Sequence, residues 1–234
     1  MFNNKSFLGI IPARGGSKRL KKKNILNLKG KPLIVWSIEA AQNSKYIDKL
    51  VVTSDNKEIL NIAKKCNTDV IARPSILSGD AASSFDTIRH TLNTLARVSE
   101  NYDYLILLQP TSPLRNEKHI DNAIEFLEKK NADAIISVCE TDHNPLWSNT
   151  LDDSLSMKDF LNNDVKNKRS QDFEKYYRLN GAIYICKVSK FLEQNGFFLK
   201  DNIYAFKMDR KSSIDIDDKI DFMIAETLIE KIDN

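Results

Sequence analysis

The sequence predicts an α/β fold in which a mostly parallel sheet carries helices on both faces. Short runs of strand-forming residues alternate with longer segments of helical period from the N-terminus to Cys139. The strand candidates are almost continuously apolar, which is typical of strands buried on both sides. The chain has 234 residues, of which 41% are hydrophobic and 29% are charged, so it can bury one ordinary core.

Each expected strand of the N-terminal part is followed by a longer amphipathic segment or by a turn. The expected strands are residues 7–13, 49–55, 69–73, 104–110 and 133–139. The expected helices are residues 32–44, 57–66, 83–98 and 118–130. Three helix starts are marked in the sequence, because Pro32 suits a first helical turn and Asp55 and Asn116 are candidate N-caps.

The pattern changes after Cys139. Residues 141–179 are polar and irregular, and a structureless loop of this length is unusual inside a compact domain, so we expect a small inserted lobe there. Regular structure is expected again in two strands, 181–187 and 203–208, and in a final helix, 217–232. The chain is therefore expected to form a single domain, 1–234, with an inserted lobe at 141–179.

The composition argues against several classes of protein. A formal net charge of +3 is too small to indicate a nucleic-acid or membrane partner by itself. The three cysteines are odd in number and lack CxxC spacing, which argues against a disulfide framework or a zinc site. The apolar run near the N-terminus is followed by basic residues and is too short to span a membrane, so we expect a cytoplasmic protein. His90, His119 and His143 lie in unrelated segments, which argues against a hydrolase triad.

A basic loop follows the first expected strand. In an open parallel sheet, ligands bind beyond the carboxyl ends of the strands. In "ARGGSKRLKKKN", Gly15 and Gly16 allow a close backbone approach, while Arg14, Lys18 and Lys23 present positive charge, a combination that suits phosphates. The alternative is a solvated basic loop.

The loop is not one of the two commonest phosphate loops. Both G-x-x-x-x-G-K-[ST] and G-x-G-x-x-G are absent, which argues against a P-loop ATPase and a dinucleotide oxidoreductase. A non-enzymatic RNA-binding surface is a further alternative, but it predicts aromatic side chains among the basic ones, and none stands between Leu8 and Val35.

Two other segments carry candidate chemistry. After the strand at 104–110, the rigid "QPTSPLR" turn begins at Gln109 and offers amide, hydroxyl and guanidinium groups to a sugar or base; the alternative is an ordinary proline-capped strand end. In "SSIDIDD", Asp215 and Asp217 share one face of an extended segment, so the two carboxylates favour a bound Mg²⁺. The alternative is a helix start capped by Asp217 or Asp218.

Six stretches together resemble the bacterial CMP-sialic acid synthetases, the N-acylneuraminate cytidylyltransferases, a family that includes CMP-legionaminic acid synthetases. In family order between residues 8 and 222, they are IIPARGGSK with KKN, VVTSDN, RPSILSGDAASS, LLQPTSPLR, NGAIYI and SIDIDD. The resemblance implies a three-layer α/β/α nucleotidyltransferase fold, Rossmann-like, whose inserted lobe is used for dimerisation. It also implies transfer of CMP from CTP to the 2-hydroxyl of a nine-carbon 2-keto acid sugar, with release of pyrophosphate, for surface polysaccharide synthesis.

The same resemblance assigns roles to individual residues. For CTP they are Arg14, Ser17, Lys18, Lys23, Asn24, Arg73, Ala82 and Ser84, with the last three reading cytosine. Gln109, Arg169 and Tyr184 are expected at the sugar, and Asp215 and Asp217 at Mg²⁺. The expected catalytic groups are Arg14, Lys18, Lys23 and Asp217, whereas Arg19, Lys21 and Lys22 are expected to be solvated. The implied partners are CTP, the sugar and a second copy of the chain, with no nucleic acid and no membrane.

Two positions depart from the sialic acid pattern. Trp147 stands where a basic residue is common, and Ser170 stands before Gln171 where an arginine is common. An aromatic ring and less charge favour a less hydroxylated, more acylated sugar such as legionaminic acid, although Arg169 or Arg178 can supply a cation. A Kdo cytidylyltransferase is the nearest alternative; a sugar-1-phosphate nucleotidyltransferase would need glycine at the positions of Ala13 and Arg14.

Overall fold

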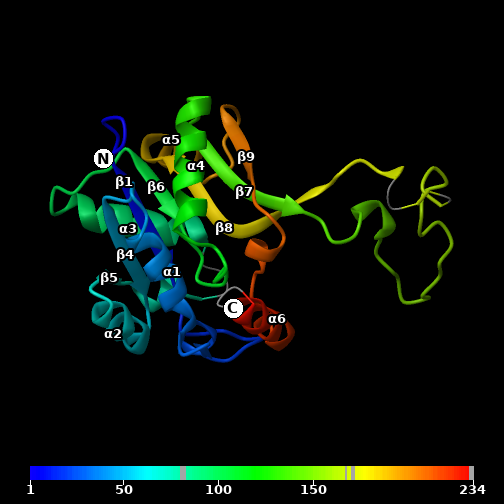
Figure 1. Cartoon of the computed structure of the whole chain (residues 1–234), viewed down its shortest axis with the longest axis horizontal. Helices are drawn as coiled ribbons and strands as arrows, with labels where there is room; N and C mark the ends of the chain where they lie inside the picture. Colours follow the sequence, from blue (N-terminus) through cyan, green and yellow to red (C-terminus); the bar gives the residue numbers. More distant parts are fainter. Residues whose placement is uncertain (80–82, 167, 170–171, 232–234) are drawn as a thin grey trace.

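A seven-stranded sheet forms the centre of the computed structural model (Figure 1), which describes residues 1–79, 83–166, 168–169 and 172–231. The strand order is β5-β4-β1-β6-β8-β7-β9. The strands are β1 (Phe7–Pro12), β4 (Lys49–Ser54), β5 (Asp69–Ala72), β6 (Tyr104–Leu107), β7 (Ala134–Glu140), β8 (Tyr177–Lys187) and β9 (Ile203–Lys207). A short hairpin of β2 (Asn27–Leu28) and β3 (Lys31–Pro32) lies beside it.

The sheet is mostly parallel, as the sequence predicts. The strand pairs β1–β4, β1–β6, β4–β5 and β7–β9 are parallel. Strand β8 is antiparallel to both of its neighbours, β6 and β7, so the sheet is mixed. The carboxyl ends of β1, β4 and β6 therefore lie at one edge of the sheet, where a ligand is expected.

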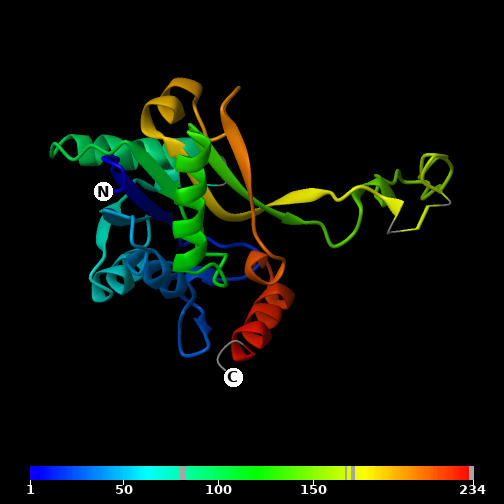
Figure 2. The same ribbon diagram turned by 45° about the horizontal axis from the view of Figure 1, so that its top comes forward.

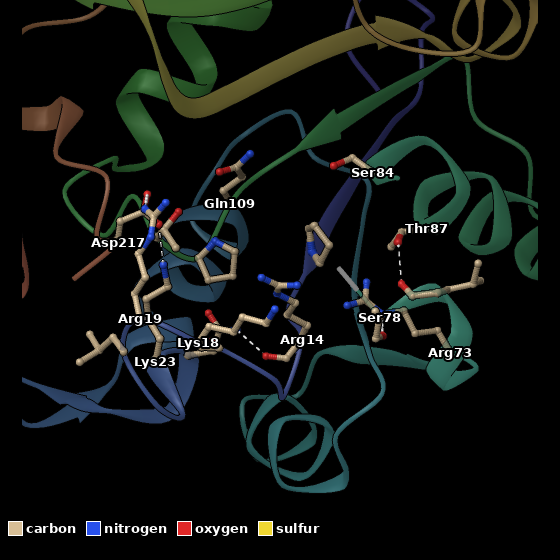
Figure 3. A pocket seen from close by; sticks show the side chains of 18 of the residues that line it. Arg14, Lys18, Arg19, Lys23, Arg73, Ser78, Ser84, Thr87, Gln109 and Asp217 are labelled. Atoms are coloured by element: carbon tan, nitrogen blue, oxygen red, sulfur yellow. Dashed lines mark hydrogen bonds and ion pairs between the residues drawn. The ribbon is translucent and has the colours of Figure 1, made fainter. Parts of the chain in front are cut away.

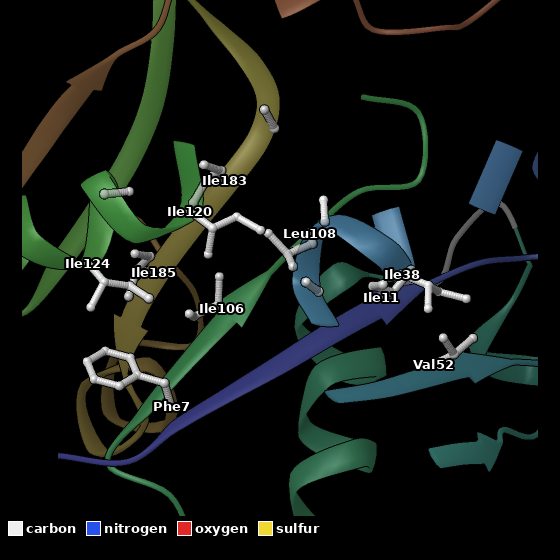
Figure 4. Close-up of a cluster of buried hydrophobic side chains, with 14 of the residues drawn as sticks. Phe7, Ile11, Ile38, Val52, Ile106, Leu108, Ile120, Ile124, Ile183 and Ile185 are labelled. Carbon is white, nitrogen blue, oxygen red and sulfur yellow. The ribbon is translucent and has the colours of Figure 1, made fainter. Parts of the chain in front are cut away.

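Helices cover both faces of the sheet and confirm the three-layer arrangement. They are α1 (Leu33–Gln42), α2 (Lys57–Lys65), α3 (Ser84–Ala96), α4 (Glu117–Lys130), α5 (Val188–Gln194) and α6 (Lys219–Glu230). Side chains from α1, α2 and α4 pack with one set of strand residues, including Ile11 and Ile106 (Figure 4). Alternate residues of the same strands, including Ile10 and Leu105, pack with α3 and α5 on the other face. This alternation follows from the two-residue period of a strand.

The helix starts agree with the sequence at two of three marked positions. Pro32 precedes α1, and Asn116 caps α4 through a reciprocal capping box with His119. The prediction for α2 was wrong by one residue, because the Asn56 side chain accepts the Glu58 and Ile59 N–H groups. Asp55 accepts the Gly15 N–H at 3.1 Å instead, so this carboxylate holds the basic loop.

The described residues between 141 and 176 form an arm that extends away from the sheet (Figures 1 and 2). The Trp147 and Phe173 rings meet edge to face at 5.3 Å within it. Strand β8 begins at Tyr177, so the last three residues of the expected lobe, 177–179, belong to the sheet and pair with β7. Helix α5, between β8 and β9, was not predicted. Within the described residues, no helix combines the length and apolar character that crossing a bilayer requires.

Candidate active site

A cavity of about 530 Å³ opens at the carboxyl ends of β1 and β6 (Figure 3). Its walls come from the basic loop, the segment before α3, the start of α3, the turn after β6 and the segment before α6. Among the described residues, the predicted members that line it are Arg14, Ser17, Lys18, Lys23, Asn24, Arg73, Ser84, Gln109 and Asp217. The fold thus brings together residues from both ends of the chain.

The lining is strongly cationic. It includes the five cations Arg14, Lys18, Arg19, Lys23 and Arg73, against a single described carboxylate, that of Asp217. A concave surface with this charge excess concentrates anions. The geometry therefore suits a polyanionic ligand such as a triphosphate.

The basic loop is fixed by contacts on its inner side. Asn24 is buried, and its Nδ2 donates to the Arg14 carbonyl at 3.0 Å, closing the loop across ten residues. At Gly15, a Cβ atom would lie 2.7 Å from Nδ2 of Asn56, so packing against the start of α2 requires glycine there. Gly16 faces open space instead, which leaves its backbone accessible to a ligand.

The C-terminal segment joins the site through ion pairs. Nζ of Lys23 donates to the Asp217 carboxylate at 3.1 Å and also to the Ile216 carbonyl. Arg19 donates to the other Asp217 oxygen at 2.9 Å. The side chain of Arg19 is 73% exposed, as the sequence suggests for a solvated residue, yet it lines the cavity and pairs with an expected metal ligand.

The opposite wall is built around Arg73. This guanidinium is buried, and its Nε donates to Oγ of Ser78 at 2.7 Å. Burial lowers the pKa of Arg73, Asp55 opposes this shift, and the charge of Arg14 adds to it. Ser84 is the first residue of α3, and Thr87 also lines the wall. Ala82, predicted to contact cytosine, lies outside the described residues.

Asp215 is not among the residues that line the cavity, but it contacts Thr111, which is. A Cβ atom at Gly181, whose φ is +72°, would lie 3.1 Å from Oε1 of Gln109 and 3.4 Å from Oδ2 of Asp215. Both side chains therefore pack over this glycine. The pKa of Asp215 is raised, chiefly by burial and further by the charges of Asp217 and Asp221, against a hydrogen bond to Thr111.

The alternation predicted for the aspartate segment is confirmed. Ile216 is fully buried in a cluster with Leu28 and Leu33, and Ile214 packs against the same cluster. Asp215 and Asp217 consequently face the other way. Asp218, the alternative cap, is the N-cap of α6 and accepts the N–H groups of residues 220 and 221.

The two aspartates fit a Mg²⁺ ion that is completed by its substrate. No group of three or more His, Cys, Asp or Glu side chains that could hold a metal is found among the described residues. Mg²⁺ is, however, commonly held by one or two carboxylates together with substrate phosphates. Burial is the main cause of the raised pKa of Asp215 and the charge of Asp217 adds to it, so a bound cation would stabilise the ionised Asp215 carboxylate. The donor set therefore fits a metal bound with a nucleotide.

The turn after β6 contributes fewer groups than the sequence suggests. Gln109 and Thr111 line the cavity, but Ser112 and Arg115 are buried beside it. Nη2 of Arg115 donates to Oγ of Ser37 at 2.5 Å, and that hydroxyl donates to the Gln109 carbonyl at 3.3 Å. Burial lowers the pKa of Arg115 to about 9, so it remains charged at neutral pH. Arg115 supports the turn from within and does not face the cavity ligand.

Two predicted sugar residues lie outside the cavity lining. Tyr184 is half-buried on β8, and burial and the charge of the nearby Asp215 raise its pKa. Arg169 is exposed in the arm and is not among the residues that line the cavity. The hydroxyl of Thr111 belongs to the turn that the sequence analysis marked, whereas Ser78 and Thr87 were missed. Ser78 lies within the RPSILSGDAASS stretch and Thr87 lies three residues after it, and neither had another signal.

Comparison with known proteins identifies the family. A family model described as cytidylyltransferase matches residues 8–232. The N-acylneuraminate cytidylyltransferase of Escherichia coli O18:K1:H7 is 37% identical over 225 residues, covering 96% of this chain and 52% of that protein. The CMP-N,N'-diacetyllegionaminic acid synthase of Legionella pneumophila is 34% identical over 233 residues, covering 95% of this chain and 96% of that protein. A pseudaminic acid cytidylyltransferase of Campylobacter jejuni is 34% identical over 222 residues, covering 94% of this chain and 95% of that protein.

Solved structures agree on the fold. A CMP:2-keto-3-deoxy-manno-octonic acid synthetase complexed with CTP superposes with a TM-score of 0.70 at 16% identity, covering 97% of this chain and 99% of that one. The chain spans about half the length of the E. coli relative and nearly all of the Legionella relative. From the match over residues 8–232, and from relatives of more than 30% identity, the chain belongs to the cytidylyltransferase family.

Proposed function

We propose that this protein transfers CMP from CTP to the 2-hydroxyl of a nine-carbon 2-keto acid sugar and releases pyrophosphate. The observation that carries the proposal is the cationic cavity. In it Lys23 of the basic loop contacts Asp217, which lies 194 residues later in the sequence. The relatives are named as an N-acylneuraminate cytidylyltransferase, a CMP-N,N'-diacetyllegionaminic acid synthase and a pseudaminic acid cytidylyltransferase, and these names support the reaction class. A cytoplasmic location and a role in surface polysaccharide synthesis belong to the same proposal and rest on the resemblance.

The cavity residues suit in-line attack of the sugar hydroxyl on the α-phosphorus of CTP. Negative charge develops on the phosphate oxygens and on the departing pyrophosphate, so fixed cations aimed at these atoms lower the barrier. Arg14, Lys18 and Lys23 would hold the triphosphate, with Ser17 and the open backbone at Gly16 beside them. Asp215 and Asp217 would hold Mg²⁺, which supplies further charge neutralisation at the phosphates when bound.

The base would occupy the wall formed by Arg73 and the start of α3. Ser78 fixes the buried Arg73 side chain, so the guanidinium is ready to donate without reorganisation. Ser84 and Thr87 place hydroxyl groups on the same wall. These donors and acceptors match the carbonyl and exocyclic amine of cytosine.

The sugar would lie between Gln109 and the C-terminal aspartates, with Tyr184 behind them. Arg169 does not line the cavity of its own chain, and the arm that carries it extends away from the sheet (Figure 2), so we propose that the arm of a second copy brings Arg169 to the site. The arm exposes apolar side chains at Leu151, Leu155 and Met157, which suits burial against another chain. We therefore propose a homodimer in which residues 141–176 form the contact.

The identity of the sugar follows from the arm in this proposal. Trp147 packs on Phe173 and offers an aromatic surface where charge is common in sialic acid enzymes. An aromatic surface favours an acylated, less hydroxylated sugar over N-acetylneuraminic acid. Legionaminic acid is accordingly the first candidate substrate and N-acetylneuraminic acid the second.

Release of pyrophosphate tests both levels of the proposal. Purified protein is mixed with CTP, Mg²⁺ and, in separate reactions, legionaminic, N-acetylneuraminic, pseudaminic and the eight-carbon Kdo acids. We expect CTP-dependent release with a nine-carbon acid, fastest with legionaminic acid. Release only with Kdo would replace the proposed substrate by its eight-carbon alternative, and no release with any of these acids would overturn the transferase proposal.

A further inference from the structure

A fully buried polar network lies next to Gly181, beginning at the preceding residue, Asn180. Its side chains belong to Asn180 on β8, Ser137 on β7 and Ser213 in the segment before α6, and none of the three is exposed to solvent. The ladder between β7 and β8 shifts register here, between Ile136 and Val138. Such bulges re-aim side chains and are frequent beside active sites.

The Asn180 amide is saturated on both sides. Its Oδ1 accepts from Oγ of Ser137 at 2.6 Å and from the Ala182 N–H at 3.2 Å. Its Nδ2 donates to Oγ of Ser213 at 2.9 Å and to Sδ of Met208 at 3.4 Å. Because burying an amide without partners is unfavourable, this complement of bonds fixes one orientation of the Asn180 side chain.

Ser213 connects the network to the aspartate segment. Its hydroxyl accepts from Asn180 and donates to the Asp209 carbonyl at 2.6 Å, so it holds the chain at a point two residues before Asp215. From there the Asp215 carboxylate reaches the Gly181 position, where Gln109 also packs. The network thus ties β8, which contains Gly181, to the segment that carries Asp215.

We propose that Asn180 and Ser213 are positioning residues for Asp215. The inference rests on the proposed function, because it gives Asp215 a role in holding Mg²⁺ with the nucleotide. Asp217 is held differently, from the basic loop through Lys23 and Arg19. The two aspartates are therefore held from different sides: Asp215 from the strand side and by its hydrogen bond to Thr111, and Asp217 from the basic loop. Loss of the strand-side support displaces Asp215 and leaves the triphosphate cations in place.

The two buried serines offer a matched pair of variants. Each hydroxyl makes two hydrogen bonds, one of them with Asn180. In the second bond, the Ser137 hydroxyl accepts the Ile183 N–H at 2.8 Å, and the Ser213 hydroxyl donates to the Asp209 carbonyl. Ser213→Ala and Ser137→Ala should therefore lower the denaturation midpoint to a similar extent. Ser213→Ala removes the direct link to the segment that bears Asp215, whereas in Ser137→Ala the Asn180 amide still accepts the Ala182 N–H and donates to Ser213, so the pair separates positioning from stability.

Steady-state kinetics gives the first readout. We expect Ser213→Ala to lower kcat by about tenfold, since small displacements of reacting groups have large effects, and to raise the Mg²⁺ concentration for half-maximal rate. The KM for CTP should change by less than about twofold, because the cations of the basic loop are untouched. Ser137→Ala should retain the wild-type kcat and Mg²⁺ dependence. Equal loss of kcat in both variants, or wild-type behaviour in Ser213→Ala, would overturn the proposal.

Metal binding gives a readout that does not require turnover. Electron paramagnetic resonance of Mn²⁺ titrated into the protein with CTP should show weaker binding to Ser213→Ala than to Ser137→Ala or wild type. Equal affinity in all three would count against the positioning role. If the wild-type protein releases no pyrophosphate with any acid, the proposed function fails. The Mn²⁺ comparison still tests whether Ser213 positions Asp215 for metal binding. If Ser213→Ala does not fold, Ser213→Cys, with a weakly hydrogen-bonding sulfur in nearly the same shape, replaces it.

Discussion

The Lys23 ammonium donates a hydrogen bond to the Asp217 carboxylate at 3.1 Å, although 194 residues separate the two in sequence. Only 12% of the Lys23 side chain is exposed, compared with 54% for Asp217. Lys23 is thus anchored against the C-terminal segment, through the Ile216 carbonyl as well, while Asp217 faces the cavity. The contact joins the expected phosphate loop to the expected metal ligand, and the first predictions concern its members.

Asp217→Asn should abolish turnover and leave the fold intact. The substitution keeps the shape of the side chain but removes the charge that Mg²⁺ and both cations face. Because the side chain is more than half exposed, unfolding free energy should change by no more than about 1 kcal/mol. Pyrophosphate release and a urea denaturation curve measure the two quantities. A wild-type rate in this variant would remove Asp217 from the metal site.

Arg19→Gln should weaken binding of CTP, while Lys21→Gln should not. Both substitutions remove one positive charge from the same loop, but only Arg19 lines the cavity and pairs with Asp217. The expected rise in Kd is about threefold to tenfold, since the group is largely exposed and screened. Isothermal titration of CTP into each variant provides the measurement. Equal effects of the two substitutions would show that only net charge matters.

Gly181→Ala should lower kcat more than Gly196→Ala does. Gly181 has φ +72° and its Cβ would meet Gln109 and Asp215, whereas a Cβ at Gly196 would meet nothing within 4 Å. The left-handed conformation alone costs about 1–2 kcal/mol for alanine, so a lower denaturation midpoint is also expected. If Gly181→Ala loses stability but keeps the wild-type kcat, the close approach of Gln109 and Asp215 has no role in turnover.

Stability should depend on pH through His119. Its Nδ1 accepts the Asn116 N–H at 3.2 Å in the cap of α4, which requires a neutral ring. Burial lowers the pKa of His119, although Asp209 at 3.7 Å opposes the shift. In the unfolded chain the histidine pKa is about 6.5, so the unfolded state binds the proton more readily than the folded state. The stabilisation that neutral His119 contributes to folding is therefore complete above that pH and is lost as pH falls through the folded-state pKa.

His119→Gln tests this assignment, because glutamine keeps an acceptor for the capping box and does not titrate. The wild-type unfolding free energy should fall relative to that of the variant between about pH 7 and pH 5. Parallel pH dependence of the two proteins would exclude His119 as the source.

The fold was largely predictable because the signals that define it are local. Apolar strand runs and amphipathic helices alternate over short distances, and the Ile214–Asp217 alternation fixes which side chains face the core. The antiparallel direction of β8 was not predictable, since no turn or period in the arm encodes which way the chain re-enters the sheet. Helix α5, only seven residues long, has no capping side chain and no long period to reveal it.

The charged residues of the site were more predictable from the sequence than the neutral side chains that hold the site in place. Charged residues such as Arg14 and Lys18 are visible in sequence because the loop concentrates them. The neutral supports are not visible, because Ser137 and Ser213 acquire their roles only from burial and from a partner far away in the chain. The role of Asp55 was not predictable for the same reason, since its carboxylate accepts the Gly15 N–H and does not cap the adjacent helix.

Complementation between two inactive variants tests whether the arm acts on a second copy. Arg169 lies in the arm and Asp217 in the cavity, so in a homodimer with exchanged arms each site takes Asp217 from one chain and Arg169 from the other. Arg169→Ala and Asp217→Asn should each be impaired alone. After unfolding and refolding together, half of the dimers are mixed, and each mixed dimer has one site with both residues intact, so about a quarter of the wild-type activity should return. If Arg169 acted on its own chain, or not at all on the sugar, mixing would restore nothing beyond the sum of the separate variants. Lys175→Ala, a substitution of an exposed lysine elsewhere in the arm that pairs with Glu140, serves as the control and should be active without mixing.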